Sequence, residues 1–324
     1  MREEAVLISF AVCGTGGAAP EYILTNETLS QMVDTSDEWI MTRTGIRERH
    51  ICTQETLLDL AASAAEEALA QAGIKGTDLD LILCATMQGD YVTPSLSCQV
   101  QQAIGAVCPA MDINGACSGF LYAMDVAAGY YARGTVKHVL VLAAECMSKH
   151  VDWEDRSTCV LFGDGAGAVV LGPGEGLAAS RLYSCGSAEH LNIRGTTGTF
   201  PPAHKKPAKQ VVHMNGQEIY RFAVQSMCRE IKAALETARM EISQMRYVLV
   251  HQANLRILEA AQKRLNITAD KMPVCLDRYG NTSSASIPLM LSELSREGKL
   301  RRGDWLVLCA FGGGLTVGTA VLRW

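Results

Sequence analysis

The sequence has no apolar run long enough to cross a membrane, no surplus of basic residues and no closely paired cysteines. Its formal net charge of −5 at pH 7 argues against a general nucleic-acid binder, which needs a positive surface. Twelve cysteines lack the paired spacing of a zinc site, which favours reduced thiols and a cytoplasmic location over disulfides or metal. Because Glu3 and Glu4 precede the first short apolar run, we expect no signal peptide.

Strand-like and helix-like segments alternate along the chain, which predicts α/β layering. The expected strands cover residues 5–12, 79–85, 139–144, 166–171, 246–250 and 305–310, and the expected helices cover residues 55–72, 218–239 and 253–265. Thr93 is expected to cap a further helix whose first residue is Pro94. The glycine-rich run at 172–176 is the expected boundary between two parts, residues 1–173 and 174–324.

Cys117 lies where an apolar, strand-like segment ends and a helix-like segment begins. The free N–H groups at a helix start carry partial positive charge, which favours the nucleophilic thiolate. Small neighbours such as Ala116 and Gly119 would let a substrate carbonyl approach the sulfur. A free cysteine is more often a buried structural residue, so Cys117 is a candidate nucleophile only together with partners.

Two candidate partners lie in the second half of the chain. His251 ends a short apolar strand, and Asn281 lies in a turn that leads into a helix. Taken alone, each has an ordinary structural interpretation: a buried histidine with satisfied hydrogen bonds, and a turn or cap asparagine. A cysteine, a histidine and an asparagine that each end an element form a more specific combination.

The segments around these residues are Gly-Ala-Cys-Ser-Gly-Phe at 115–120, His-Gln-Ala-Asn-Leu-Arg at 251–256 and Tyr-Gly-Asn-Thr-Ser-Ser at 279–284. They resemble the β-ketoacyl-[acyl-carrier-protein] synthase III family, condensing enzymes that start bacterial fatty acid synthesis. The resemblance extends over the whole chain through Ser-Asp-Glu-Trp-Ile at 36–40, Thr-Arg-Thr-Gly-Ile-Arg-Glu-Arg at 42–49, Phe-Gly-Asp-Gly-Ala-Gly-Ala at 162–168 and Phe-Gly-Gly-Gly at 311–314.

The resemblance implies a duplicated thiolase-like fold, an α-β-α-β-α layered sandwich, and a reaction that needs no cofactor. An acyl-CoA would acylate Cys117, and malonyl-acyl-carrier protein would then lose CO₂ and attack the acyl-cysteine. By the same resemblance, His251 and Asn281 hydrogen-bond the malonyl thioester oxygen as it becomes an enolate. The backbone N–H groups of Cys117 and Gly313 would hold the tetrahedral oxyanion.

Two related enzyme classes are disfavoured by single positions. Elongating ketoacyl synthases use a second histidine where this chain has Asn281. Thiolases use a second cysteine at the position of Ala310. Cys309 is one residue away, and in a strand an offset of one residue points its side chain to the opposite face.

Further positions match the family's binding surfaces. Trp39, Arg43 and Arg156 match positions that hold the adenine end of CoA by stacking and cationic contact. Gly216 and Asn254 match positions along the pantetheine tunnel. The alternative interpretation of the Trp39 group is a tryptophan anchor beside solvated arginines.

A basic face is expected to receive the acidic acyl-carrier protein. On helix 253–265, Arg256, Lys263 and Arg264 are expected opposite the stripe Leu255, Leu258, Gln262 and Leu265. Arg221 lies on a neighbouring helix at a matching family position. A basic helix face is more often merely solvated, but this helix follows directly from His251.

The chain departs from the family pattern at two places. Many relatives have a bulky aromatic residue at Thr93, which reaches over from the other subunit of a homodimer and caps the acyl pocket. Its replacement would open space for a longer or branched acyl chain, unless Met87, Tyr91 or Leu96 refills the gap. Asn114-Gly115 replaces the small apolar residues expected before Cys117, and nothing in the sequence explains the change.

Three functions are compatible with these motifs. The first is the initiating condensing enzyme. The second is a secondary-metabolite ketosynthase of the same fold, with a specialised starter or a CoA-linked extender. The third is a non-catalytic thiolase-fold partner subunit, which is disfavoured because such subunits typically lose the nucleophile that this chain keeps.

Overall fold

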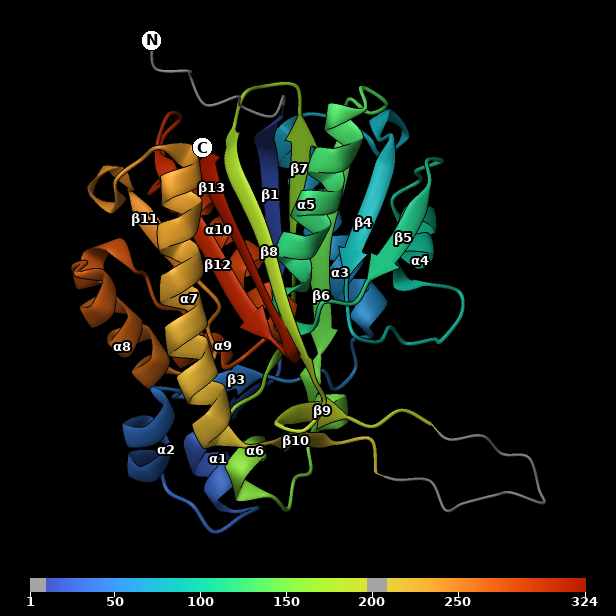
Figure 1. The fold of residues 1–324 in the computed structure, drawn as a ribbon. Helices are drawn as coiled ribbons and strands as arrows, with labels where there is room; N and C mark the ends of the chain where they lie inside the picture. The colour runs from blue at the N-terminus through green and yellow to red at the C-terminus, as the bar shows by residue number, and fades with distance from the viewer. Residues whose placement is uncertain (1–9, 197–208) are drawn as a thin grey trace.

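The computed structural model describes residues 10–196 and 209–324. A five-stranded sheet in the order β1-β7-β6-β4-β5 comes entirely from the first part of the chain (Figure 1). Its strands are β1 Ala11–Ala18, β4 Leu81–Ala85, β5 Ala110–Ile113, β6 Val139–Cys146 and β7 Asp164–Gly172. Strand β4 pairs in parallel with β5 and β6, whereas β7 pairs antiparallel with β6 and β1.

A four-stranded sheet in the order β11-β12-β13-β8 comes from the second part. Its strands are β8 Leu177–Ser187, β11 Tyr247–Val250, β12 Trp305–Gly312 and β13 Gly314–Arg323. Two short pairs complete the strands: β2 Ile23–Thr25 with β3 Glu48–His50, and β9 Leu191–Ile193 with β10 Val212–Met214. Strand β11 pairs in parallel with β12, and β13 pairs antiparallel with β12 and β8.

Ten α-helices are found in the described residues: α1 Asn26–Ser30, α2 Asp37–Thr44, α3 Leu57–Ala72, α4 Leu96–Ala103, α5 Gly119–Ala132, α6 Arg156–Cys159, α7 Gly216–Ala238, α8 Leu255–Leu265, α9 Leu276–Tyr279 and α10 Ser286–Arg296. Helix α3 begins at a capping box of Thr56 and Asp59 and ends at Gly73, whose φ of 69° is left-handed. Within the described ranges, none of the helices is long and apolar enough to cross a membrane.

Alternate residues of each sheet face different layers, because successive side chains of a strand point in opposite directions. In β4, Leu81 and Leu83 belong to the central core with α5 and α10, whereas Ile82 and Cys84 pack in the outer core with α3. The second sheet shares that central core, and its other face packs against α7 and α8. The order of layers is therefore α-β-α-β-α, as predicted.

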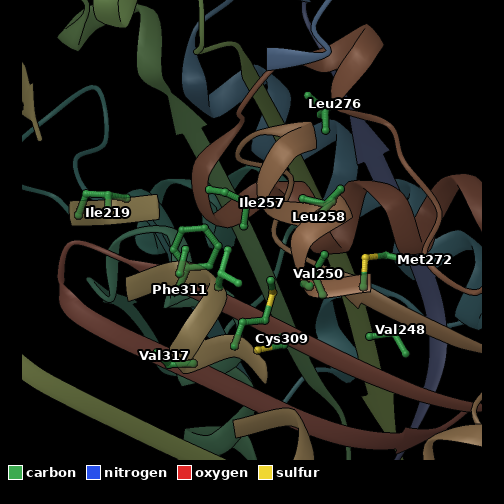
Figure 2. Close-up of a cluster of buried hydrophobic side chains, with 14 of the residues drawn as sticks. Ile219, Val248, Val250, Ile257, Leu258, Met272, Leu276, Cys309, Phe311 and Val317 are labelled. Atoms are coloured by element: carbon green, nitrogen blue, oxygen red, sulfur yellow. The ribbon is translucent and has the colours of Figure 1, made fainter. Parts of the chain in front are cut away.

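The outer core of the second part lines one side of the main cavity. Strands β11, β12 and β13 contribute Val250, Cys309, Phe311 and Val317, and helix α8 contributes Ile257 and Leu258 (Figure 2). Ile257 and Phe311 also line the main cavity of the molecule. The same packing that stabilises this layer therefore fixes one side of the site.

The two parts repeat one order of elements. The first follows β1, α3, β4, α5, β6 and β7, and the second follows β8, α7, β11, α10, β12 and β13. The strand pairings also correspond, although β5 has no counterpart strand in the described part of the second half. The residues just before α5 and α10 even share a left-handed backbone, with φ of 46° at Ala116 and 51° at Ser283. The duplicated thiolase-like architecture is thereby confirmed.

Several predicted boundaries differ from the structure. Ser95, not Thr93, caps the helix that follows Pro94, because its hydroxyl accepts a hydrogen bond from the Cys98 N–H group and the helix begins at Leu96. The first strand begins at Ala11 rather than ending at Val12, and residues 5–9 lie outside the described residues. Strands β8 and β13 were not predicted, because exposed, polar or glycine residues interrupt their apolar pattern.

Candidate active site

The predicted cysteine, histidine and asparagine meet at one cavity of about 1,090 Å³. Cys117 lies in a short 3₁₀ turn before α5, His251 follows β11, and Asn281 follows α9. All three line the cavity, together with Gly312 and Gly313 at the end of β12. The four elements come from both halves of the chain, so the site requires the two halves to be packed together.

The backbone before Cys117 is held in an unusual conformation. Ala116 has a left-handed φ of 46°, and its N–H group donates to the Asn114 side chain at 3.2 Å. A Cβ atom on Gly115 would lie 2.9 Å from the Gly119 Cα atom, so only glycine fits there. The Asn114-Gly115 pair thus fits the bend that presents Cys117.

The pKa of the Cys117 thiol shifts in the direction opposite to the sequence-based expectation. Burial raises this pKa to about 12, and a hydrogen bond from Ser283 lowers it only in part. The Ser283 hydroxyl lies 3.4 Å from the sulfur. Desolvation therefore outweighs the favourable helix start in the unliganded site, and the thiol must lose its proton during the reaction.

Gly312 packs directly against the nucleophile. A Cβ atom at this position would lie 2.6 Å from the Cys117 N atom and 3.2 Å from the Ser118 N atom. At Gly313 the nearest atom would be 3.6 Å away, an ordinary contact. The glycine run is therefore a close approach of two backbones rather than a flexible turn, and Gly312 is the position that requires it.

His251 is buried and neutral. Burial lowers its pKa to about 3, so the imidazole carries no charge at neutral pH. Its Nδ1 atom lies 2.8 Å from the Ser286 hydroxyl, and that oxygen accepts a weak hydrogen bond from the Gln252 N–H group at 3.4 Å. The Ser286 hydroxyl can donate to Nδ1, an arrangement that places the imidazole proton on Nε2.

Asn281 is fixed by its own turn. Its Oδ1 atom accepts a hydrogen bond from the Ser283 N–H group at 2.9 Å. The Asn281 N–H group donates to Leu161 at 2.8 Å, and the Asn281 carbonyl accepts from Gly163 at 3.1 Å. Since the carboxamide oxygen is engaged by the turn, the Nδ2 group is the donor that the side chain offers to the cavity.

Glu145 is a buried residue of the site that the sequence analysis missed. Its carboxylate accepts hydrogen bonds from Met87 N at 3.2 Å, Ser283 Oγ at 3.2 Å and Ser284 Oγ at 2.7 Å. Burial raises its pKa to about 7. One acidic residue near the end of an otherwise apolar strand was the available signal, because a buried carboxylate needs a specific reason.

Ser283 connects Glu145 to the nucleophile. Its single hydroxyl proton can be donated to Glu145 or to the Cys117 sulfur, but not to both. An ionised Glu145 attracts this proton more strongly than a protonated one, which can itself donate to a serine hydroxyl, Ser284 at 2.7 Å or Ser283 at 3.2 Å. Ser283 makes the only side-chain hydrogen bond to Cys117 given by the described residues, and the charge of Glu145 acts on the proton of that bond.

The three residues predicted to hold the adenine end of CoA lie together, although Arg156 does not line the cavity. Trp39 and Arg43 line the cavity, and the Arg43 guanidinium carbon lies 4.7 Å from the Trp39 ring centroid. Arg156 stacks on the same ring at 4.9 Å and donates to the Asp34 carbonyl at 2.7 Å. The indole thus contacts two cations.

Both residues predicted to lie along the pantetheine tunnel line the cavity, but the Asn254 side chain already makes two hydrogen bonds. Its Oδ1 atom caps α8 by accepting from Arg256 N at 2.9 Å, and its Nδ2 donates to the Arg43 carbonyl at 3.1 Å. Gly216 is the first residue of α7 and has open space where a Cβ atom would lie. Asn254 therefore joins α8 to α2 at the cavity mouth.

The predicted basic face is exposed, but its apolar stripe differs from the expected one. Arg256, Lys263 and Arg264 are exposed on α8, and only Arg256 of these lines the cavity. The buried residues of α8 are Ile257, Leu258, Ala261 and Leu265. Leu255 and Gln262 are only half-buried, so the helix is rotated relative to the expected stripe. Arg221 on α7 forms an ion pair with Glu218 at 2.8 Å.

The residue predicted to face an acyl pocket lies away from the main cavity of its own chain. Thr93 is exposed and does not line the cavity of its own chain, whereas Met87 does.

Cys309 points into the outer core, and its sulfur accepts a hydrogen bond from Thr319 at 3.3 Å, while Ala310 faces the central core. The predicted opposite orientation of Cys309 and Ala310 is confirmed.

Comparison with known proteins agrees with this geometry. A model of the family described as 3-oxoacyl-[acyl-carrier-protein (ACP)] synthase III matches residues 111–186, and the model of its C-terminal part matches residues 235–324. The β-ketoacyl-[acyl-carrier-protein] synthase III of Xylella fastidiosa (strain 9a5c) is 46% identical over 317 residues, which cover 97% of this chain and 98% of that protein.

Solved structures give the same result. The crystal structure of 3-oxoacyl-[acyl-carrier-protein] synthase III from Aquifex aeolicus VF5 has a TM-score of 0.91 and 44% identity, and the match covers 97% of this chain and 100% of that one. The priming β-ketosynthase of the R1128 polyketide pathway has the same TM-score but 32% identity, over 100% of this chain and 98% of that one. This chain therefore belongs to the β-ketoacyl-[acyl-carrier-protein] synthase III family of condensing acyltransferases.

Proposed function

We propose that this chain catalyses the decarboxylative condensation of an acyl-CoA with malonyl-acyl-carrier protein, which initiates type II fatty acid synthesis. The observation that supports this most strongly is the position of Cys117, His251 and Asn281 around one cavity whose outer end carries Trp39 and Arg43. The reaction is complete with these protein groups and the two thioester substrates, so the proposal includes no cofactor. The products are β-ketoacyl-acyl-carrier protein, CoA and CO₂.

In the first half-reaction, the Cys117 sulfur attacks the acyl-CoA carbonyl. The carbonyl becomes a tetrahedral oxyanion, which we assign to the backbone N–H groups of Cys117 and Gly313. The Gly312 contact holds these two backbones together. The oxyanion then collapses, the bond to the CoA sulfur breaks, and CoA leaves with the proton that Cys117 has lost.

In the second half-reaction, malonyl-acyl-carrier protein loses CO₂ and its thioester oxygen becomes an enolate oxygen. We assign the Nε2–H group of His251 and the Nδ2 group of Asn281 as the two donors to this oxygen. A neutral imidazole suits the role, because it can donate this hydrogen bond without giving up its proton. The enolate carbon then attacks the acyl-cysteine and releases Cys117.

Substrate delivery is assigned to the outer surface. The adenine ring of CoA stacks on Trp39 after Arg156 moves aside, with Arg43 beside it. The pantetheine arm passes Gly216 and Asn254. The acidic acyl-carrier protein docks on exposed basic side chains of α7 and α8, which are Arg221, Arg256, Lys263 and Arg264, with Arg256 at the cavity itself.

The assembly of the protein is also part of the proposal. The chain divides into residues 1–173 and 174–324 and forms a homodimer in the cytoplasm. The loop that carries Thr93 exposes two apolar side chains, with Tyr91 61% and Val92 90% exposed, which is typical of a surface covered by a partner. In such a dimer, Thr93 faces the acyl pocket of the partner subunit and leaves room for longer starters.

The proposal is tested by mass spectrometry of the protein after incubation with acetyl-, isobutyryl- and octanoyl-CoA. We expect a stable acyl adduct on the Cys117 peptide and no adduct in Cys117→Ala, because the thioester needs this sulfur. The chain length that reacts fastest reports the starter preference, and a strong preference for acetyl-CoA would contradict the role of Thr93. Failure of every acyl-CoA to modify Cys117 in the folded protein would contradict the first half-reaction.

Glu145→Gln tests the control of Ser283 by pH. Below pH 7 the wild-type Glu145 is protonated and, like a glutamine amide, donates to Ser283. Above pH 7 the wild-type carboxylate ionises and draws the Ser283 proton away from Cys117. We therefore expect the ratio of variant to wild-type acylation rates to be flat below pH 7 and to rise by about tenfold above it, the scale of one charge-assisted hydrogen bond.

The control for this experiment is Ser283→Ala, which keeps Glu145 but removes the hydroxyl that connects it to the sulfur. This variant is expected to be slow at pH 6, where the wild-type hydroxyl donates to Cys117. Adding Glu145→Gln to it should give no further dependence on pH. A ratio for Glu145→Gln that stays constant from pH 6 to 8.5 would show that Glu145 does not act through Ser283.

A further inference from the structure

Cys52 and Cys146 form a second thiol site, outside the cavity of the proposed reaction. Cys52 follows β3, Cys146 ends β6, and Asp164 begins β7. The two sulfur atoms and a carboxylate oxygen of Asp164 all lie within 4.8 Å of one another. The two cysteines are far apart in sequence, so only the fold brings them together.

This pair is accessible from outside the protein. A surface pocket of about 320 Å³ is lined by both cysteines and by Asp90, Lys149 and Trp153. Cys52 is half-buried, and Cys146 is 6% exposed. The pocket is therefore an entry path for a small thiol or disulfide to both sulfur atoms.

The surroundings favour thiol chemistry over metal binding. Asp164 already accepts hydrogen bonds from Cys52 N at 2.8 Å, Ser148 N at 2.8 Å and Ser148 Oγ at 2.6 Å. The Cys146 sulfur donates to the same carboxylate at 3.5 Å. A carboxylate held by four protein donors orients the loop and has little capacity left for a cation.

The surroundings of the two thiols shift their pKa values in opposite directions. A hydrogen bond from Cys52 lowers the pKa of Cys146 and raises the pKa of Cys52, and Lys149 also lowers the pKa of Cys146. Lys149 itself is held beside the pair by an ion pair with Asp90 at 2.6 Å. Lys149 lines the pocket together with both sulfur atoms and stabilises a thiolate formed there, and the proposal below takes Cys146 as the attacking thiol and Cys52 as the resolving one.

We propose that Cys52 and Cys146 close to a reversible disulfide when they meet a low-molecular-weight disulfide, and that this closure slows acylation of Cys117. The Cys146 thiolate attacks one sulfur of the reagent, forms a mixed disulfide and displaces the first reagent thiolate. The Cys52 thiolate then attacks the Cys146 sulfur and displaces the second. The two cysteines lose two electrons and two protons, and the reagent disulfide gains both to become two thiols.

The position of Cys146 in the chain connects the pair to the reaction site. Its neighbour Glu145 holds the serine that contacts Cys117. On its other side, Met147 and His150 line the main cavity. Since the Cys52–Cys146 bond draws β6 and β3 together at this point, it moves residues on both sides of Cys146 that face Cys117. This half of the inference rests on the proposed function, whereas disulfide formation does not.

Disulfide formation is tested with the full-length Cys117→Ala protein, so that the nucleophile cannot react. The protein is incubated in glutathione buffers of increasing oxidised fraction, its free thiols are alkylated, and its peptides are mapped by mass spectrometry. We expect a cross-linked Cys52–Cys146 peptide that disappears on addition of dithiothreitol. Mixed glutathione adducts on either cysteine without the cross-linked peptide, or no oxidation of either, would overturn the proposal.

The effect on the reaction is tested by acyl-adduct formation on otherwise wild-type protein. Glutathione disulfide also attacks Cys117, so the comparison is between the wild type and Cys52→Ser, which keeps Cys117 but cannot close the bond. We expect oxidation to slow the wild type by about threefold more than Cys52→Ser, a typical coupling between packed elements. Dithiothreitol should restore the rate of the wild type and abolish the difference. Cys98→Ser and Cys185→Ser, which remove exposed cysteines, should behave as the wild type. Equal inhibition of the wild type and Cys52→Ser would contradict the coupling.

Discussion

Asn281→Asp is expected to reduce condensation by about 10²–10³-fold, the effect of losing one donor to a developing oxyanion. Aspartate has the size of asparagine and keeps the oxygen that accepts from Ser283 N, so the turn before α10 is preserved. It replaces the Nδ2 donor by an oxygen that repels the enolate. Acylation of Cys117 uses the backbone oxyanion donors instead, and it should change by only a few-fold.

The two half-reactions can be measured separately. Acylation is followed by mass of the Cys117 peptide after incubation with acyl-CoA, and decarboxylation by CO₂ release from malonyl-acyl-carrier protein. The matched comparison is Ser286→Ala, which leaves the His251 ring in place but removes its partner at Nδ1. This variant should lower decarboxylation and spare acylation in the same manner, since both changes affect donors to the enolate. Equal losses of acylation and decarboxylation in a folded Asn281→Asp protein would contradict its assigned role.

Much of the fold was predictable because its central strands are buried on both faces. Strands β6 and β7 have no exposed residue, so their sequences are largely continuous apolar runs, and their predicted bounds are correct to within two residues. Strand β13 was missed because Gly314, Thr316, Gly318 and Thr319 interrupt its apolar pattern. Its hydrogen bonds to β12 and β8 on either side decide its conformation, and β8 is distant in sequence.

The site was predictable in its chemistry but not in its electrostatics. Motifs identified Cys117, His251 and Asn281, yet the local helix start alone predicted the wrong direction for the pKa of Cys117. That pKa depends on how much water the surrounding layers exclude, which is a property of the assembled cavity. Glu145 was missed for a related reason: its partner Ser283 lies far along the chain, and only the packed structure shows the contact.

Gly312→Ala is expected to reduce both half-reactions by about 10²-fold or more, because its Cβ atom would lie 2.6 Å from the Cys117 N atom. Neither backbone can move aside without displacing the β12 strand or the bend at Ala116, so the proposed oxyanion donor turns away from the substrate oxygen. The loss should appear in the rate of acylation at saturating acyl-CoA as well as in condensation.

Gly313→Ala is the matched control, since it adds the same methyl group one residue away. Its Cβ atom would lie 3.6 Å from Leu191 and 3.7 Å from Ala116, and alanine keeps the N–H group that the proposal uses. We expect this variant to retain activity within about tenfold of the wild type, because a methyl group in ordinary van der Waals contact disturbs the site little. Circular dichroism and thermal unfolding of both variants separate misfolding from a displaced donor. If Gly312→Ala is as active as Gly313→Ala, the approach of β12 to Cys117 does not position the oxyanion donors.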